Sequence, residues 1–262
     1  MMKTLRYSLW AALLALLITS FLMPIACAGD DDDSSGDDDT ADDDDSSGDE
    51  PVLPEFSASN FSDPATIDNP YMSWIPGYVW TYVESTEDGD QDVVVTVTSD
   101  TKTIMGIDCV VVHDIVTMDG ETIEDTLDWY AQDDEGNVWY MGEDTAEYED
   151  GEIVSTEGSW EGGVDGALPG IVMYADPQVG DYYYQEYYPG EAEDLGEVIA
   201  LNETVTVEAG TFENCVVIEE TNPLEPDVLE HKYHCPDVAN VALAEDKSGE
   251  GDREELVEMT MK

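Results

Sequence analysis

The feature that most constrains this chain is an internal repeat built around two cysteines. Gly106–Asp114 reads G-I-D-C-V-V-V-H-D, and Thr211–Glu219 reads T-F-E-N-C-V-V-I-E, so a cysteine precedes a run of β-branched residues in both. The segments on either side recur at a similar spacing, which is the signature of a duplicated structural unit. The sequence therefore predicts two copies of one β unit, at about 77–144 and 180–246, joined by a connector at 145–179.

The fold class follows from the residue pattern within each copy. Runs rich in Val, Ile, Thr, Tyr and Trp favour strands, and no window shows sustained helical periodicity. Asp119-Gly120 between two such runs predicts a tight hairpin. We expect an all-β fold, a mainly antiparallel sheet that is half-barrel or sandwich-like, made from two copies of a β-meander. Residues 51–262 would form this single domain, with any ligand pocket between the copies.

The N-terminus has the pattern of an export signal. Lys3 and Arg6 precede the apolar segment Leu9–Met23, which is short for a membrane span. We interpret residues 1–26 as a signal peptide. The tetrapeptide at 24–27, P-I-A-C, resembles the lipobox of bacterial lipoproteins, although Pro24 stands where that motif usually has Leu.

Two cleavage products are therefore consistent with the sequence. Cleavage before Cys27 would leave a lipidated N-terminus anchored in a membrane, and Ala28 after the cysteine resembles the pattern sorted to the outer membrane. Cleavage at Ala26-Cys27-Ala28 by the ordinary signal peptidase would release a secreted or periplasmic soluble protein. We favour the lipoprotein, whose partner is the membrane reached through the lipid.

Residues 27–50 are dominated by Asp with Ser and Gly. A segment of this composition has no apolar surface to bury, so we predict a disordered, extended tether.

The charge of the whole chain excludes one class of partner. It holds 64 acidic and 7 basic residues, for a formal net charge of −57. Nucleic-acid phosphates require clustered Lys and Arg, so we expect no nucleic-acid binding. Self-repulsion of this size calls for screening by salt or by loosely bound Ca²⁺ and Mg²⁺. We predict no other cofactor.

Three cysteines lie beyond Cys27. An exported chain can form disulfides, and an odd number leaves one thiol over. A Cys215–Cys235 bridge would close a loop of about 20 residues, worth roughly 3 kcal/mol, and would leave Cys109 as a buried thiol. A Cys109–Cys215 bridge between the copies is the alternative.

One cluster suggests metal binding. His231, His234 and Cys235 are ligand types for Zn²⁺ or copper. An extended strand points residues 231 and 235 to one face and residue 234 to the other, so the cluster would need ligands from elsewhere.

A second cluster suggests a ligand groove. Tyr182, Tyr184, Glu186 and Tyr188 alternate along one segment and would share a face of a strand. Aromatic rings in such a row can stack on flat ligands. Packing within the sheet is the competing interpretation.

The sequence contains none of the common catalytic motifs, such as G-x-S-x-G, H-E-x-x-H or a dinucleotide fingerprint. We therefore predict that the chain is not an enzyme but a binding or structural module at the cell envelope. The alternatives are a periplasmic metal-binding protein that uses the His–Cys cluster, a lipid-binding carrier and a hydrolase.

Several segments together resemble a family of uncharacterised bacterial secreted and lipoprotein β domains. The family has no known catalytic residues, so the resemblance implies a β-rich domain and no activity. Near its end the family usually reads Y-x-A-P-G-V-G, whereas this chain has Tyr233–Ala239, Y-H-C-P-D-V-A. The matching segments are Asn69–Tyr71, Pro76–Tyr82, Asp128–Asp133, Gln185–Ala192 and Val207–Phe212.

Overall fold

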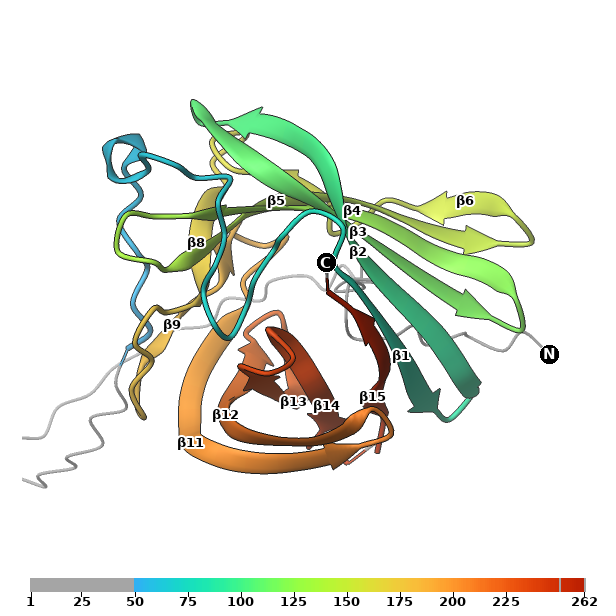
Figure 1. Ribbon diagram of the computed structural model, residues 1–262. Coiled ribbons are helices and arrows are strands. Elements are labelled where there is room, and N and C mark those ends of the chain that lie inside the picture. Colours follow the sequence, from blue (N-terminus) through green and yellow to red (C-terminus); the bar gives the residue numbers. More distant parts are fainter. Residues whose placement is uncertain (1–49, 250, 262) are drawn as a thin grey trace, which may run out of the picture.

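The computed structural model describes residues 50–249 and 251–261. Within them the chain forms one sheet of 15 strands and a short 3₁₀ helix at Ala58–Asn60. All pairs of neighbouring strands are antiparallel, which confirms the predicted all-β, mainly antiparallel fold. The sheet is a single open layer that curls around an interior (Figure 1), as the half-barrel form predicts. No helix of the described residues has the length and apolarity needed to cross a membrane.

Most strands are long and joined by tight turns. They are β1 (Val79–Thr86), β2 (Gly89–Ile104), β3 (Ile107–Met118), β4 (Glu121–Gln132), β5 (Val138–Glu149), β6 (Glu152–Ser155), β7 (Trp160–Glu161), β8 (Leu168–Met173), β9 (Tyr182–Tyr184), β10 (Glu186–Tyr187), β11 (Leu195–Val207), β12 (Gly210–Asn222), β13 (Glu225–Cys235), β14 (Asn240–Asp246) and β15 (Arg253–Thr260).

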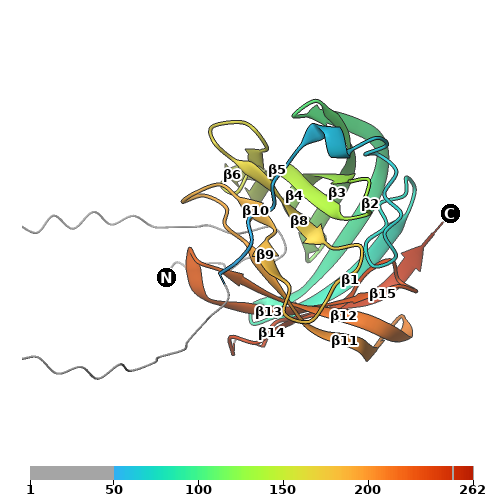
Figure 2. The ribbon, with the colours of Figure 1, turned by 90° about the vertical axis from the view of Figure 1, so that its left-hand side faces the viewer.

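The strand order brings the two ends of the sheet to one place in the chain. The order is β10-β8-β5-β4-β3-β2-β1-β15-β14-β13-β12-β11-β9, with β6 and β7 paired to β5. The terminal strands β9 and β10 are separated only by Gln185. The chain therefore steps from one edge of the curled sheet to the other at this residue, and Figure 2 shows β9 and β10 lying close to β8.

The hairpin between β3 and β4 forms where Asp119-Gly120 predicts it. Met118 pairs with Glu121, and the two turn residues have positive φ of 55° and 81°. Positive φ at both central positions is what a two-residue turn with the right twist requires, and Asp-Gly supplies it at low steric cost.

The strands of the two copies pair in equivalent registers. On β3 and β4, Val110 lies opposite Tyr130, and on β12 and β13, Val216 lies opposite His234. One residue beyond the second pair, a disulfide joins Cys215 to Cys235. The equivalent positions in the first copy are Cys109 and Ala131, both fully buried, and Cys109 is a free thiol. Replacement of one cysteine by alanine thus leaves the first copy without its bridge.

The segment before β1 crosses the opening between the copies. The Asn69 amide donates hydrogen bonds to the carbonyls of Gly136 (3.0 Å) and Tyr174 (3.1 Å). The Ser73 amide donates to the carbonyl of Ala239 at 2.8 Å. These bonds tie the segment to both copies and hold Trp74, which is 4 % exposed, against the interior.

The equivalence of the two cysteine positions predicts the outcome of an engineered bridge. Ala131→Cys should form a disulfide with Cys109 on oxidation, because its place matches that of Cys235. A closed loop of this length should raise the free energy of unfolding by about 3 kcal/mol. Peptide mapping under non-reducing conditions and urea unfolding would measure both effects.

Ala131→Ser is the control for the altered side chain. A free thiol at both positions after oxidation, or no gain in stability over the reduced form, would contradict the equivalence of the two registers.

Candidate ligand-binding cavity

The inside of the curled sheet contains a cavity of about 140 Å³. Its volume is enough for several water molecules or a small organic molecule, since one water needs roughly 10–15 Å³ on this measure. The walls come from both copies, from β8 and from the segment before β1. The lining residues are Met72, Trp74, Val95, Val112, Asp114, Asp128, Tyr130, Tyr140, Glu143, Val172, Gln185, Glu186, Asp194, Glu220, Thr221, Asn222, Val228, Glu230, Lys232, His234, Asn240 and Val241.

One wall of the cavity is a row of stacked aromatic rings. The ring centroids of Trp74 and Tyr130 are 4.9 Å apart with an interplanar angle of 27°. Those of Tyr130 and Tyr140 are 5.0 Å apart at 20°. Tyr140 also meets Trp160 edge-on at 5.5 Å, behind the wall. Stacked rings of this kind present flat apolar faces and are attractive surfaces for apolar or cationic ligands.

The remaining walls carry an unusual number of carboxyl groups. Alternate inward positions on the strands, such as Asp114 on β3, Asp128 on β4 and Glu220 on β12, hold acids where a curled sheet normally places apolar side chains. Seven acids line the cavity in all: Asp114, Asp128, Glu143, Glu186, Asp194, Glu220 and Glu230.

Burial shifts most of these acids toward their neutral form. Burial, and next the neighbouring Asp128, raise the pKa of Asp114 and of Glu143 well above the ordinary values. Burial and Asp194 do the same to the pKa of Glu186. Burial raises the pKa of Glu230 to about 7 even though a nearby ammonium opposes the shift. Removing a carboxylate from water disfavours its charge, and like charges close by add to the cost.

Lys232 is the ammonium that lines the cavity. Its Nζ forms an ion pair with Glu220 and lies 3.5 Å from Oε2 of Glu230. Burial opposes the charge of this lysine, but Glu220 and Glu230 outweigh that effect and raise its pKa above the ordinary value. Lys232 therefore compensates the acids contributed by its own half of the sheet.

His234 lies next to Lys232 in the lining and is 2 % exposed. Burial lowers the pKa of its imidazole to about 4, so the ring is neutral at pH 7. Neither ring nitrogen makes a hydrogen bond within the described residues.

Other buried polar atoms on the cavity wall also lack a hydrogen-bond partner among the described residues. They are Nε1 of Trp74, Oδ1 of Asp114 and Nδ2 of Asn240. Most buried polar groups in folded proteins are paired, so a group of exceptions around one cavity indicates a place for a bound molecule or ordered water.

The predicted groove of Tyr182, Tyr184, Glu186 and Tyr188 does not form as one surface. Residues 182–184 pair with β11 and residues 186–187 pair with β8, so Gln185 breaks the alternation on which the prediction rested. Tyr184 packs against Tyr187, and Tyr188 packs beside Trp160. Of the four residues only Glu186 lines the cavity.

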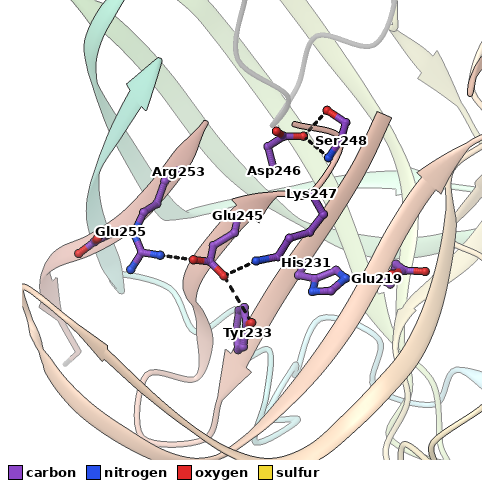
Figure 3. Close-up of polar contacts among 9 residues, drawn as sticks. All are labelled: Glu219, His231, Tyr233, Glu245, Asp246, Lys247, Ser248, Arg253 and Glu255. Atoms are coloured by element: carbon purple, nitrogen blue, oxygen red, sulfur yellow. Dashed lines mark hydrogen bonds and ion pairs between the residues drawn. The ribbon is translucent and has the colours of Figure 1, made fainter. Parts of the chain in front are cut away.

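The predicted metal cluster is also not supported. Cys235 is bonded to Cys215, which removes the thiolate that a metal would need. His231 points to the outer face, where its Nε2 lies 2.8 Å from Glu219 (Figure 3). His234 instead lines the cavity. Among the residues that the structure describes, no group of His, Cys, Asp and Glu side chains converges closely enough to hold a metal ion.

The same outer face carries the few basic residues of the C-terminal strands. Lys247 lies 2.7 Å from Glu245, and Arg253 forms an ion pair with the same carboxylate (Figure 3). The Tyr233 hydroxyl donates to Glu245 at 3.4 Å. These contacts join β13, β14 and β15 on the outer face of the sheet. The inner face carries the acids of the cavity and Lys232.

Sequence reasoning missed the acids of the cavity. Asp114 interrupts an apolar run, and Asp128 follows it on the paired strand, which is a signal for inward polar residues. In a chain with 64 acids this signal has little weight without knowledge of which face turns inward. Cys27 lies outside the described residues, so the structure does not bear on its lipidation.

No family model matches the chain, and no curated protein matches it. Among solved structures it is similar to a chain described as "a putative lipoprotein from Parabacteroides distasonis ATCC 8503". The two are 12 % identical with a TM-score of 0.41, over 75 % of this chain and 99 % of the other.

The raised pKa values predict an uncommon pH dependence of stability. Burial raises the pKa of Glu230 to about 7 and that of Glu124, also in the interior, to about 8. Between pH 4.5 and 8 the folded state therefore holds protons that the unfolded state has lost, and the free energy of unfolding should fall as pH rises. We expect the Tm to drop by roughly 15–25 °C from pH 5 to pH 8, since each pKa unit is worth about 1.4 kcal/mol and each kcal/mol shifts the Tm of a domain of this size by about 2–4 °C.

Calorimetry at constant ionic strength would measure this drop. Glu230→Gln should flatten the curve, while Glu121→Gln, at an exposed position, should leave its slope unchanged. A Tm that rises or stays constant across this range would contradict the account of the interior acids.

Proposed function

We propose that this chain is a non-catalytic ligand-binding module of the cell envelope, and that its ligand is a small molecule held in the central cavity. The observation that carries the proposal is the cavity itself, which is lined by both copies and by polar atoms that have no hydrogen-bond partner among the described residues. Each unpaired buried polar group costs about 1–3 kcal/mol. A bound molecule that pairs with these atoms would offset that cost.

The location rests on the N-terminal sequence. A signal-like segment, the P-I-A-C sequence ending at Cys27 and a long Asp-rich stretch support export, acylation and attachment through a tether. The binding domain would then stand away from the bilayer. The outer membrane is the proposed destination because Ala28 follows the cysteine.

The composition of the cavity wall argues against a lipid-binding carrier. Seven carboxyl groups and one ammonium surround the space, and an acyl chain could not pair with any of them. Burying these groups against hydrocarbon would add to their desolvation cost.

A hydrolase of sugars is the second candidate, and one observation favours it. The pKa of Glu143 is raised by burial and by Asp128, so a neutral and an ionised carboxyl can lie side by side next to aromatic rings. Glu143→Gln would abolish cleavage of nitrophenyl glycosides if this role were real. We favour binding because the acids are spread around the whole wall.

Two neighbouring valines on β2 allow a direct test of binding in the cavity. Val95 lines the cavity and Val94 lies on the opposite face of the strand. Val95→Phe should occupy part of the space and weaken binding of a cavity ligand at least tenfold, while Val94→Phe should not. Ligand-detected NMR with small amines, alcohols and carboxylates on the full chain would measure both.

The proposal of a binding module fails if no compound of the panel shows binding that Val95→Phe removes. It is supported by any compound that binds the wild type and the Val94→Phe variant but not the Val95→Phe variant.

The proposed anchor predicts a clear result for Cys27→Ser. Wild-type protein made in a Gram-negative host should sediment with membranes and carry acyl chains on Cys27, and the variant should lose both properties. Mass spectrometry of the mature N-terminus is the measurement. An unmodified N-terminus at Gly29 would show instead that the ordinary signal peptidase acts at Ala26-Cys27-Ala28.

A further inference from the structure

The two halves of the cavity are equivalent in register but carry opposite charges at one position. Val112 lies opposite Asp128 on β3 and β4, and Ile218 lies opposite Lys232 on β12 and β13. Asp128 of the first copy therefore occupies the position that Lys232 occupies in the second. In the same way Asp114 corresponds to Glu220, because the two stand two residues beyond Val112 and Ile218.

In the second copy this arrangement contains a cation. The ammonium of Lys232 forms an ion pair with Glu220, and Glu230 lies 3.5 Å away on the same strand. A buried acid and base in contact compensate each other's loss of hydration. Lys232 is thus a cation of the protein itself that lies against the carboxylates of Glu220 and Glu230.

The first copy has no ammonium at the equivalent position. Asp128 raises the pKa of Asp114 by repulsion, and it does the same to Glu143. The Asp128 carboxylate accepts a hydrogen bond from the Tyr140 hydroxyl at 2.7 Å. Burial raises the pKa of Asp128 to about 6, although this hydrogen bond and the nearby His113, which pairs with Asp125 at 2.8 Å, oppose the shift. Among the described residues that line the cavity, Lys232 is the one with an ammonium, and it is held by the other half.

One carboxylate oxygen in this half of the cavity is buried without a partner. Oδ1 of Asp114 makes no hydrogen bond within the described residues, and the residue is only 6 % exposed. An ionised carboxylate oxygen is an acceptor, so the missing partner is a hydrogen-bond donor.

We propose that the cavity binds an organic ammonium ion, whose charged group lies among Asp114, Asp128 and Glu143 in the place that Lys232 takes in the other copy. This inference rests on the proposed binding function and names its ligand class. An ammonium group supplies both the positive charge and the three N–H donors that these carboxyls lack. Its presence favours their ionised form.

The aromatic wall explains why the cation would be organic rather than a metal ion. Trp74, Tyr130 and Tyr140 form a stacked row beside the acids. An alkyl chain can pack on these rings, and the ammonium gains from their faces through cation–π attraction. The acids do not converge on one point as metal ligands must, and no such group occurs in the described part of the chain.

Three compounds of equal length test the ligand class. n-Butylammonium, 1-butanol and butyrate differ in charge but share a four-carbon chain. Titration of each into the full chain at pH 7.5, followed by NMR at constant ionic strength, should show saturable binding for n-butylammonium, with at least tenfold weaker binding for the other two. Ammonium chloride should bind at least tenfold more weakly than n-butylammonium, because it lacks the alkyl chain.

Binding of butanol or butyrate in preference to the amine, lost in Val95→Phe, would overturn this inference and leave the binding module intact. Equal binding of ammonium chloride would also overturn it. The absence of any ligand sensitive to Val95→Phe would remove the proposed function as well.

The internal symmetry gives a sharper test. Asp128→Lys should place an ammonium beside Asp114, as Lys232 does beside Glu220, and should abolish n-butylammonium binding while raising the Tm. Glu121→Lys makes the same charge change at an exposed position of the same strand and should leave binding within twofold. Asp128→Asn, which keeps an acceptor for Tyr140, should weaken binding at least tenfold.

Unchanged n-butylammonium affinity in Asp128→Asn would overturn the assignment. So would an Asp128→Lys variant that folds, is no more stable than Glu121→Lys and still binds the amine. If Asp128→Lys does not fold, the Asp128→Asn result decides alone.

Discussion

The structure depends on how a curled antiparallel sheet offsets the cost of burying carboxyl groups on its inner face. Strands alternate their side chains, so every second residue of β3, β4, β12 and β13 must face the interior. At several of these positions the chain carries Asp or Glu in place of an apolar residue. Burial shifts most of them toward the neutral form, and Lys232 pairs with Glu220 and Glu230.

The β3–β4 and β12–β13 pairs share their pairing registers, so their side chains can be compared position by position. The two pairs differ at single positions. Cys235 closes a disulfide where Ala131 does not, and Lys232 compensates acids where Asp128 adds to them. The first copy thus lacks both the disulfide and the lysine, and it is also the half that holds the aromatic wall. Functional sites are where proteins commonly lack stabilising contacts, and this half of the cavity has that property.

The sequence predicted the strands, the Asp119-Gly120 hairpin and the all-β class because these depend on local patterns. It did not predict the groove, because the break at Gln185 follows from the meeting of two sheet edges far apart in the strand order. The cavity was equally hidden: which face of a strand turns inward depends on the curl of the whole sheet. Trp74 reaches the cavity through hydrogen bonds between distant segments, which no local pattern encodes.

The central claim is that a group of carboxyls inside the sheet stays protonated near neutral pH. Carbon-13 NMR titration of the Asp and Glu carboxyls in the ligand-free protein tests it most directly. The account predicts several resonances that titrate above pH 6, among them Glu230 and Glu124 with pKa values of about 7 and about 8. A titration in which every carboxyl ionises between pH 3 and pH 5 would contradict it.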